Sequence, residues 1–152
     1  MGNVSLGSAI IVMAVLGGTM IAAQGVVNGR MASAMGGPMQ AAFISFSIGW
    51  LALLALNLAL GQSVSPARAL ETAPWWAWLG GVMGAVVVTL AAFAVPKIGV
   101  ATYVSAFIAG QLTAALFYDH FGLLGQTVRE ITPLRLLGVG LMGAGVFLIR
   151  RY

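Results

Sequence analysis

Few side chains in this 152-residue sequence could do chemistry, and most of them are amides. Gln24 and Asn28 are four residues apart, which places them on one face of a helix. Gln111 lies within another apolar stretch, and an acid and an imidazole, Asp119 and His120, follow it. A side-chain amide has donors and an acceptor that one helix cannot satisfy, so in an apolar medium its partner is another helix, water or a ligand.

The composition indicates the medium around these amides. Hydrophobic residues make up 61% of the chain and charged residues 7%, whereas a soluble domain carries about a quarter charged residues. Several continuous apolar runs approach the roughly 20 residues that cross a bilayer core, and they lack the alternation of a β-barrel strand. We therefore expect an all-α integral membrane protein, with residues 1–152 in one transmembrane domain. Its five predicted helices cover about 8–29, 39–61, 75–95, 99–118 and 134–149.

Prolines and small residues refine these helices. Pro38, Pro74 and Pro133 are each expected at a first helical position, which tolerates a missing N–H, with Thr132 as the N-cap of the last helix. The stretch "VPKIGV" predicts a tight break between the third and fourth helices.

Two pairs of small residues have the four-residue spacing that lets membrane helices approach closely. They are Ser45 with Gly49 in the second predicted helix and Gly80 with Gly84 in the third. We expect both pairs to form helix contacts and not ligand sites.

Around Gln111, helical periodicity places an amide within an aromatic face formed by Tyr103, Phe107 and Tyr118. Two interpretations follow: the amide joins two helices, or it lines a cavity. The same two apply to Gln24 and Asn28. Under the cavity interpretation, the candidate substrate-binding residues are Gln24, Asn28, Tyr103, Phe107 and Gln111.

The sequence lacks the side chains that several kinds of chemistry require. There is no cysteine, and one histidine with three acids cannot supply a metal site or a nucleophile, base and orienting acid, so we expect no metal, no cofactor and no enzyme. The chain has no cluster of basic residues that would indicate binding to nucleic acid. No charged residue falls in the middle of a predicted helix. Asp119 and His120 lie at a helix end, either as interfacial anchors or as a gate or proton relay.

The charges between the helices bear on orientation. With five crossings, one side of the membrane carries four Lys and Arg residues and the other carries three: Arg30, Lys97, Arg150 and Arg151 against Arg68, Arg129 and Arg135. So small a bias barely specifies orientation. Either the chain inserts both ways and pairs with an inverted copy of itself, or other features fix one orientation.

The sequence resembles the drug/metabolite transporter superfamily, in its short five-helix EamA-like branch of the YdcZ type. The resemblance spans most of the chain and is carried by "QGVVNGRMASAMGGP" (24–38), "SFSIG" (45–49), "PWWAWLGGVMGA" (74–85), "PKIGVAT" (96–102) and "AGQLTAALFYDHFG" (109–122). It implies a bacterial inner-membrane, multi-pass protein in a group whose small helical units pair, often inverted. It also implies that Gln24, Asn28, Gln111, Asp119 and His120 occupy signature positions. Related four-helix exporters have a glutamate in the first helix; this chain has none, so their cation/proton exchange is not carried over.

The hypothesis is a transporter subunit for a small molecule, working by alternating access in a dimer with itself, antiparallel, or with a paralogous partner. Its cavity would be lined by the first and fourth helices. A passive dual-topology channel and a non-transporting membrane subunit are the alternatives. The identity and charge of the substrate and the coupling ion do not follow from the sequence.

Overall fold

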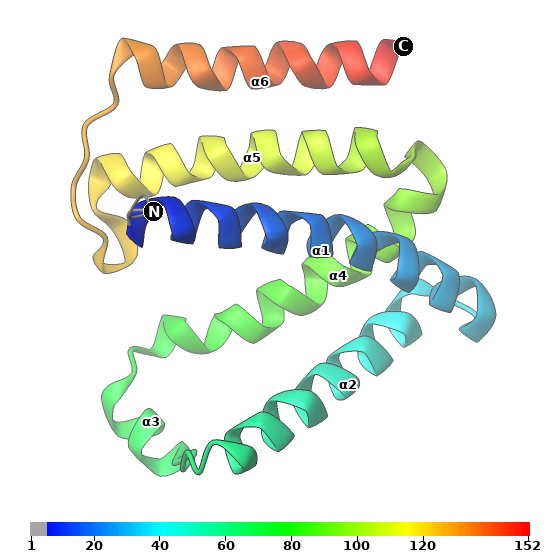
Figure 1. Ribbon diagram of the computed structural model, residues 1–152, viewed down its shortest axis with the longest axis vertical. Coiled ribbons are helices and arrows are strands. Elements are labelled where there is room, and N and C mark those ends of the chain that lie inside the picture. The colour runs from blue at the N-terminus through cyan, green and yellow to red at the C-terminus, as the bar shows by residue number, and fades with distance from the viewer. Residues whose placement is uncertain (1–5) are drawn as a thin grey trace, which may run out of the picture. The chain divides into compact units, whose positions relative to one another are not determined.

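The computed structural model describes residues 6–152, and the regular elements of that range are helices (Figure 1). Five segments in it are long and apolar enough to cross a membrane, which confirms the predicted fold class. They are α1 (Leu6–Met35), α2 (Pro38–Ala59), Trp75–Ile98, α5 (Val100–Phe121) and α6 (Pro133–Arg151). Segment Trp75–Ile98 consists of the 3-10 turn η1 (Trp75–Trp78) and α4 (Leu79–Ile98). A short helix that the sequence analysis did not predict, α3 (Pro66–Thr72), follows α2.

Two of the three predicted proline starts are confirmed. Pro38 and Pro133 are the first residues of α2 and α6. The Thr132 hydroxyl caps α6 by accepting a hydrogen bond from the backbone N–H of Arg135 at 3.3 Å. Pro74 is different, because it lies in extended conformation just before η1 and caps that turn. The third span therefore begins as a 3-10 turn and becomes α-helical only at Leu79.

The predicted break within "VPKIGV" is present, but it lies at Gly99 and not at Pro96. α4 continues through Pro96 to Ile98, and Gly99 ends it with a φ of 83°, a conformation that favours glycine. A proline removes one helical N–H but is tolerated inside a membrane helix when neighbouring groups satisfy the freed carbonyl. The stop signal is thus the glycine and not the proline.

Contacts within the chain divide it into two compact units, Met1–Lys97 and Ile98–Tyr152. In the first unit, small residues bring three helices together, with a core of Ala32 from α1, Ala41 from α2 and Ala92 from α4. A Cβ atom on Gly25 would lie 3.0 Å from Val95 Cγ2. The absence of a side chain at Gly25 therefore lets α1 and α4 approach each other closely. Close helix approach through small residues is the usual basis of packing in lipid, where apolar burial gives no driving force.

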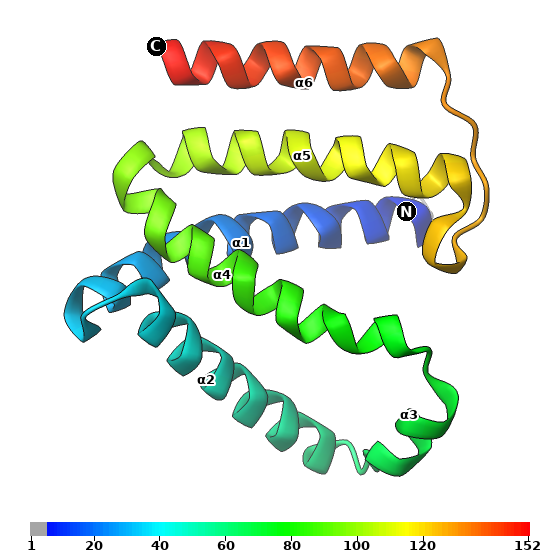
Figure 2. The same cartoon turned by 180° about the vertical axis from the view of Figure 1, so that it is seen from behind.

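α1 and α2 meet at the turn that contains Gly36 and spread apart away from it (Figure 1). α4 also diverges from the first half of α1, as the reverse view in Figure 2 shows. The buried residues of α1 accordingly all lie in its second half: Gly25, Asn28, Gly29 and Ala32. α1 is therefore packed against the other helices only in its second half, and its first half is left to present surface.

The second unit is a pair of antiparallel helices, α5 and α6 (Figure 2). Gly122 ends α5 in the left-handed conformation, with its N–H bonded to the carbonyl of Tyr118. A side chain there would also meet Val128 Cγ2 at 2.9 Å, so the connection to α6 folds tightly against the end of α5.

Candidate functional site

A groove in the first unit contains one of the predicted site residues. Gln24 of α1 lies in its wall, and the groove has a volume of about 350 Å³. The other lining residues belong to α2 and α4: Ser45, Phe46, Gly49, Trp50, Leu53 and Val88. None of these seven residues is charged. The groove therefore offers an amide, a hydroxyl and two aromatic side chains to a ligand.

Glycines shape the groove. A Cβ on Gly84 of α4 would lie 3.1 Å from Phe46 Cζ, so the absence of a side chain lets the ring of Phe46 pack on α4. This confirms the expected helix contact at Gly84, but not at Gly80, where nothing lies within 4 Å of a Cβ. Nothing lies within 4 Å of a Cβ on Gly49, which lines the groove together with Ser45. The expected helix contact is therefore absent at Gly49 within the described chain, whereas Ser45 is half-buried.

The polar groups of the groove have no hydrogen-bond partner in the part of the chain that the structure describes. Hydroxyls elsewhere in the spans donate to a carbonyl three or four residues earlier, at 2.8 to 3.1 Å: Ser47, Thr89, Ser105 and Thr113. Ser45 forms no such bond, and the Gln24 amide forms none with any residue of the range 6–152. In a bilayer these groups require a partner from outside the monomer.

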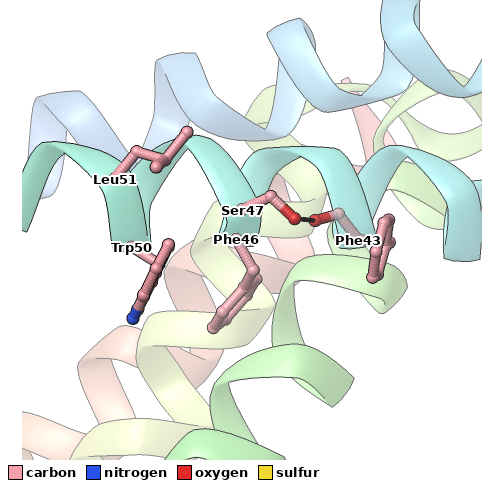
Figure 3. A pocket seen from close by; sticks show the side chains of 5 residues that line it. All are labelled: Phe43, Phe46, Ser47, Trp50 and Leu51. Carbon is pink, nitrogen blue, oxygen red and sulfur yellow. Dashed lines mark hydrogen bonds between the residues drawn. The ribbon is translucent and has the colours of Figure 1, made fainter.

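α2 carries a second hollow, of about 450 Å³ (Figure 3). Its lining residues follow helical spacing along α2: Phe43, Phe46, Ser47, Trp50 and Leu51. The Ser47 hydroxyl donates to the Phe43 carbonyl at 2.9 Å, so this surface offers aromatic and aliphatic contact and no free hydroxyl. Phe46 and Trp50 line both hollows, which makes them the shared wall between an apolar face and the polar groove.

Asn28 does not share the groove with Gln24, although they lie on the same helix four residues apart. Its side chain is 2% exposed, between the glycines that contact α4, and its Nδ2 has no hydrogen-bond partner among the described residues. The structure thus places one predicted amide in an open groove and the other in a helix contact.

The aromatic face predicted around Gln111 belongs to the second unit. The rings of Tyr103 and Phe107 stack, with centroids 5.8 Å apart and planes 14° apart. Gln111 is exposed one turn further along α5, and its amide forms no hydrogen bond within residues 6–152. Gln111 therefore resembles Gln24: both are exposed amides on spanning helices with no hydrogen-bond partner among residues 6–152.

Asp119 and His120 lie together at the end of α5, and both contact the connection to α6. The Asp119 carboxylate lies 3.6 Å from Arg135 Nη1, and His120 Nδ1 accepts a hydrogen bond from the Ile131 N–H at 3.4 Å. The backbone carbonyl of Asp119 also accepts from the Arg129 N–H at 2.8 Å. These contacts match the anchoring interpretation of the pair. No group of three His, Asp or Glu side chains comes together in the described part of the chain.

Comparison with known families gives the decisive match. Residues 9–148 match the model of the family described as "Putative inner membrane exporter, YdcZ". The chain belongs to this family. The YdcZ family and the five spans make it a multi-pass inner-membrane protein, and the family description supports a membrane transporter and not an enzyme. No curated protein and no solved structure gave a significant match to the chain.

For this YdcZ-family chain, sequence reasoning missed Phe46 and Trp50. A usable signal was present, because Trp50 lies in the middle of a span, whereas tryptophans in membrane proteins gather at the interfaces. Helical spacing would then have joined Trp50 to Phe46 and Phe43 on one face of α2.

Proposed function

We propose that this chain is a subunit of a small-molecule transporter that works by alternating access as a dimer. The observation that carries the proposal is the pair of amides, Gln24 and Gln111, which are exposed on spanning helices and have no hydrogen-bond partner in the described range 6–152. Unpaired amides are costly in hydrocarbon, so their positions favour a polar ligand, water or a second subunit beside them.

The proposed substrate is uncharged, or nearly so, and carries an aromatic or other planar group. The Gln24 groove supports this class, since its lining residues include no charge and combine the Gln24 amide and the Ser45 hydroxyl with the rings of Phe46 and Trp50. Small-molecule sites are commonly apolar with a few well-placed polar groups. Under this proposal Gln24 orients the substrate and the rings stack on it.

The second subunit is proposed to be an inverted copy of the same chain, and a paralogous partner is the variant of that proposal. The near-balanced loop charges support inversion, and an inverted pair would let the cavity open to either side in turn. The cavity of the dimer is proposed to be lined by α1 and α5 through Gln24, Tyr103, Phe107 and Gln111, with the α2 groove residues adjoining Gln24. Asn28 is left out of this lining, because it is buried in the contact between α1 and α4. Asp119 and His120 act as a gate or relay in the strongest form of this hypothesis.

Counterflow in proteoliposomes tests the proposal. Vesicles loaded with an unlabelled aromatic amine, alcohol or amide should accumulate the labelled compound from outside, saturably, and Gln24→Leu should abolish this exchange. Thr89→Val, which alters a self-satisfied hydroxyl, is the matched control and should transport normally. Rapid, non-saturable flux without exchange would identify a channel. No flux or binding across the panel would indicate a non-transporting subunit.

A further inference from the structure

The contact between α1 and α4 is built on two glycines and a proline. A Cβ on Gly29 would lie 2.9 Å from Pro96 Cγ, and one on Gly25 would lie 3.0 Å from Val95 Cγ2. A side chain at Gly29 would force a shift at the Pro96 ring, and one at Gly25 would require the Val95 side chain to give way by a few tenths of an ångström. This is the point of closest approach that the structure describes between α1 and α4, and both helices diverge from it toward their N-terminal ends (Figures 1 and 2).

Asn28 brings an unpaired donor to this contact. It lies on the same buried face of α1 as Gly25 and Gly29 and is 2% exposed. Its Nδ2 has no acceptor among residues 6–152. Buried donors are nearly always paired, so an unpaired one in a closely packed helix contact requires an explanation.

Pro96 brings an acceptor without its helical donor to the same contact. In an α-helix the carbonyl of Ala92 would accept from the N–H of residue 96, but proline has none. The freed Ala92 oxygen faces α1, since it lies 3.8 Å from the position of a Cβ on Gly29. The contact therefore contains an unpaired donor, Asn28 Nδ2 on α1, and an acceptor that lacks its helical donor, the Ala92 carbonyl on α4. The Ala92 carbonyl faces Gly29, the residue next to Asn28.

We propose that Asn28 and Pro96 are positioning residues of a pivot between α1 and α4. The pivot has two arrangements: the one described here, and one in which Asn28 Nδ2 donates to the Ala92 carbonyl. Forming this bond rotates α1 on α4 about the two glycines. The groove lies on the diverging side of the pivot, with Gln24 of α1 and Val88 of α4 both in its lining, so the rotation changes the width of the groove. The two arrangements of the pivot do not require a substrate. Only the role of the pivot in transport rests on the proposed function.

Because the chain has no cysteine, two can be introduced cleanly. Ala14→Cys on α1 and Met83→Cys on α4 are exposed positions on the diverging arms. Spin labels on this pair, in proteoliposomes with an excess of unlabelled cysteine-free protein to suppress distances between subunits, should give two populations of distance by pulsed electron paramagnetic resonance.

Two substitutions should each remove one population. Asn28→Ala removes the donor, and Pro96→Ala restores the helical N–H and occupies the Ala92 carbonyl. The double variant should behave as either single one does, because both act on one bond. Asn57→Ala is the matched control: Asn57 already donates to the Leu53 carbonyl at 2.8 Å, and its loss should leave both populations. Circular dichroism and gel filtration establish that each variant is folded.

A single distance in the parent protein would overturn the pivot, as would an Asn28→Ala variant that melts earlier but keeps both populations. Additive effects of the two substitutions would also overturn it, because they would place Asn28 and Pro96 in separate interactions. If counterflow fails for all compounds while Asn28→Ala removes one population, the pivot stands and the transport proposal does not.

Discussion

The carboxylate of Asp119 lies 3.6 Å from the guanidinium of Arg135, across the connection between α5 and α6. Both side chains are about one third exposed, at 36% and 33%. Arg135 Nη1 also lies 3.4 Å from the carbonyl of Arg129, so one side chain ties the end of α5 to the loop and to the first turn of α6. The pair thus joins the two helices of the second unit at one end.

Asp119→Asn should weaken this joint modestly. Exposed ion pairs contribute about 0–1 kcal/mol, so we expect a small fall in melting temperature and a double-mutant cycle with Arg135→Gln that shows coupling of that order. Counterflow should change little if the pair is only an anchor. A large loss of transport with unchanged melting would instead support the gate.

His120 carries a prediction about pH. Its Nδ1 accepts a hydrogen bond from the Ile131 N–H, which a doubly protonated ring cannot do. A ring protonated on both nitrogens would therefore lose this contact. If the pair gates transport, the transport rate should depend on pH, and His120→Gln should flatten the profile. An identical profile in the variant would leave His120 as an anchor.

Gln111→Leu separates the two interpretations of that amide. Leucine keeps most of the volume and removes an unpaired polar group, so under the cavity interpretation melting and dimerisation should persist while counterflow falls by about tenfold, the value of one hydrogen bond. Under the interhelical interpretation the variant should lose about 0.6 kcal/mol of stability, and at most about 1.7 kcal/mol, and should melt at a lower temperature. Normal transport with earlier melting would remove Gln111 from the site.

Gly49→Leu tests the groove by filling it. Nothing lies within 4 Å of a Cβ at this position, so the substitution should fold normally while its side chain enters the space beside Gln24. One extra methylene group in a binding pocket changes discrimination between substrates by about tenfold or more. Because leucine adds a larger group to the groove, we expect the rate of counterflow to fall by at least that factor. Gly80→Leu is the matched control, because its Cβ also meets nothing and it does not line the groove. Equal activity of the two variants would place the substrate elsewhere.

Orientation can be read from one introduced cysteine. Gln62→Cys lies just after α2, and if the chain inserts both ways, impermeant maleimide should label it from both sides of the membrane. Adding two lysines as Gln126→Lys and Thr127→Lys should lock one orientation and confine labelling to one side. One-sided labelling of Gln62→Cys alone would exclude the inverted homodimer and leave a paralogous partner.

The five spans were predictable because continuous apolar runs have few alternatives in a bilayer, and Thr132 with Pro133 gave a start signal that depends on neighbouring residues alone. The Gln24 groove was not predictable in the same way. It depends on which residues of α2 face α1, and a helix as apolar as Pro38–Ala59 has too few polar residues to set its rotation. The burial of Asn28 likewise depends on Val95 and Pro96, which are distant in sequence and which only folding brings to Gly25 and Gly29.

The length of α1 has a consequence for the surrounding lipid. α1 has 30 residues and α2 has 22, so their lengths are about 45 Å and 33 Å, although one tight turn joins them. In a hydrocarbon layer about 30 Å thick, α2 fits with little adjustment, and α1 must lean or protrude. A thinner bilayer would press α1 into a steeper lean while leaving α2 nearly upright. Acyl-chain length would thereby change the angle between α1, which carries Gln24, and α2, which carries Trp50. The width of the groove would then depend on the thickness of the membrane.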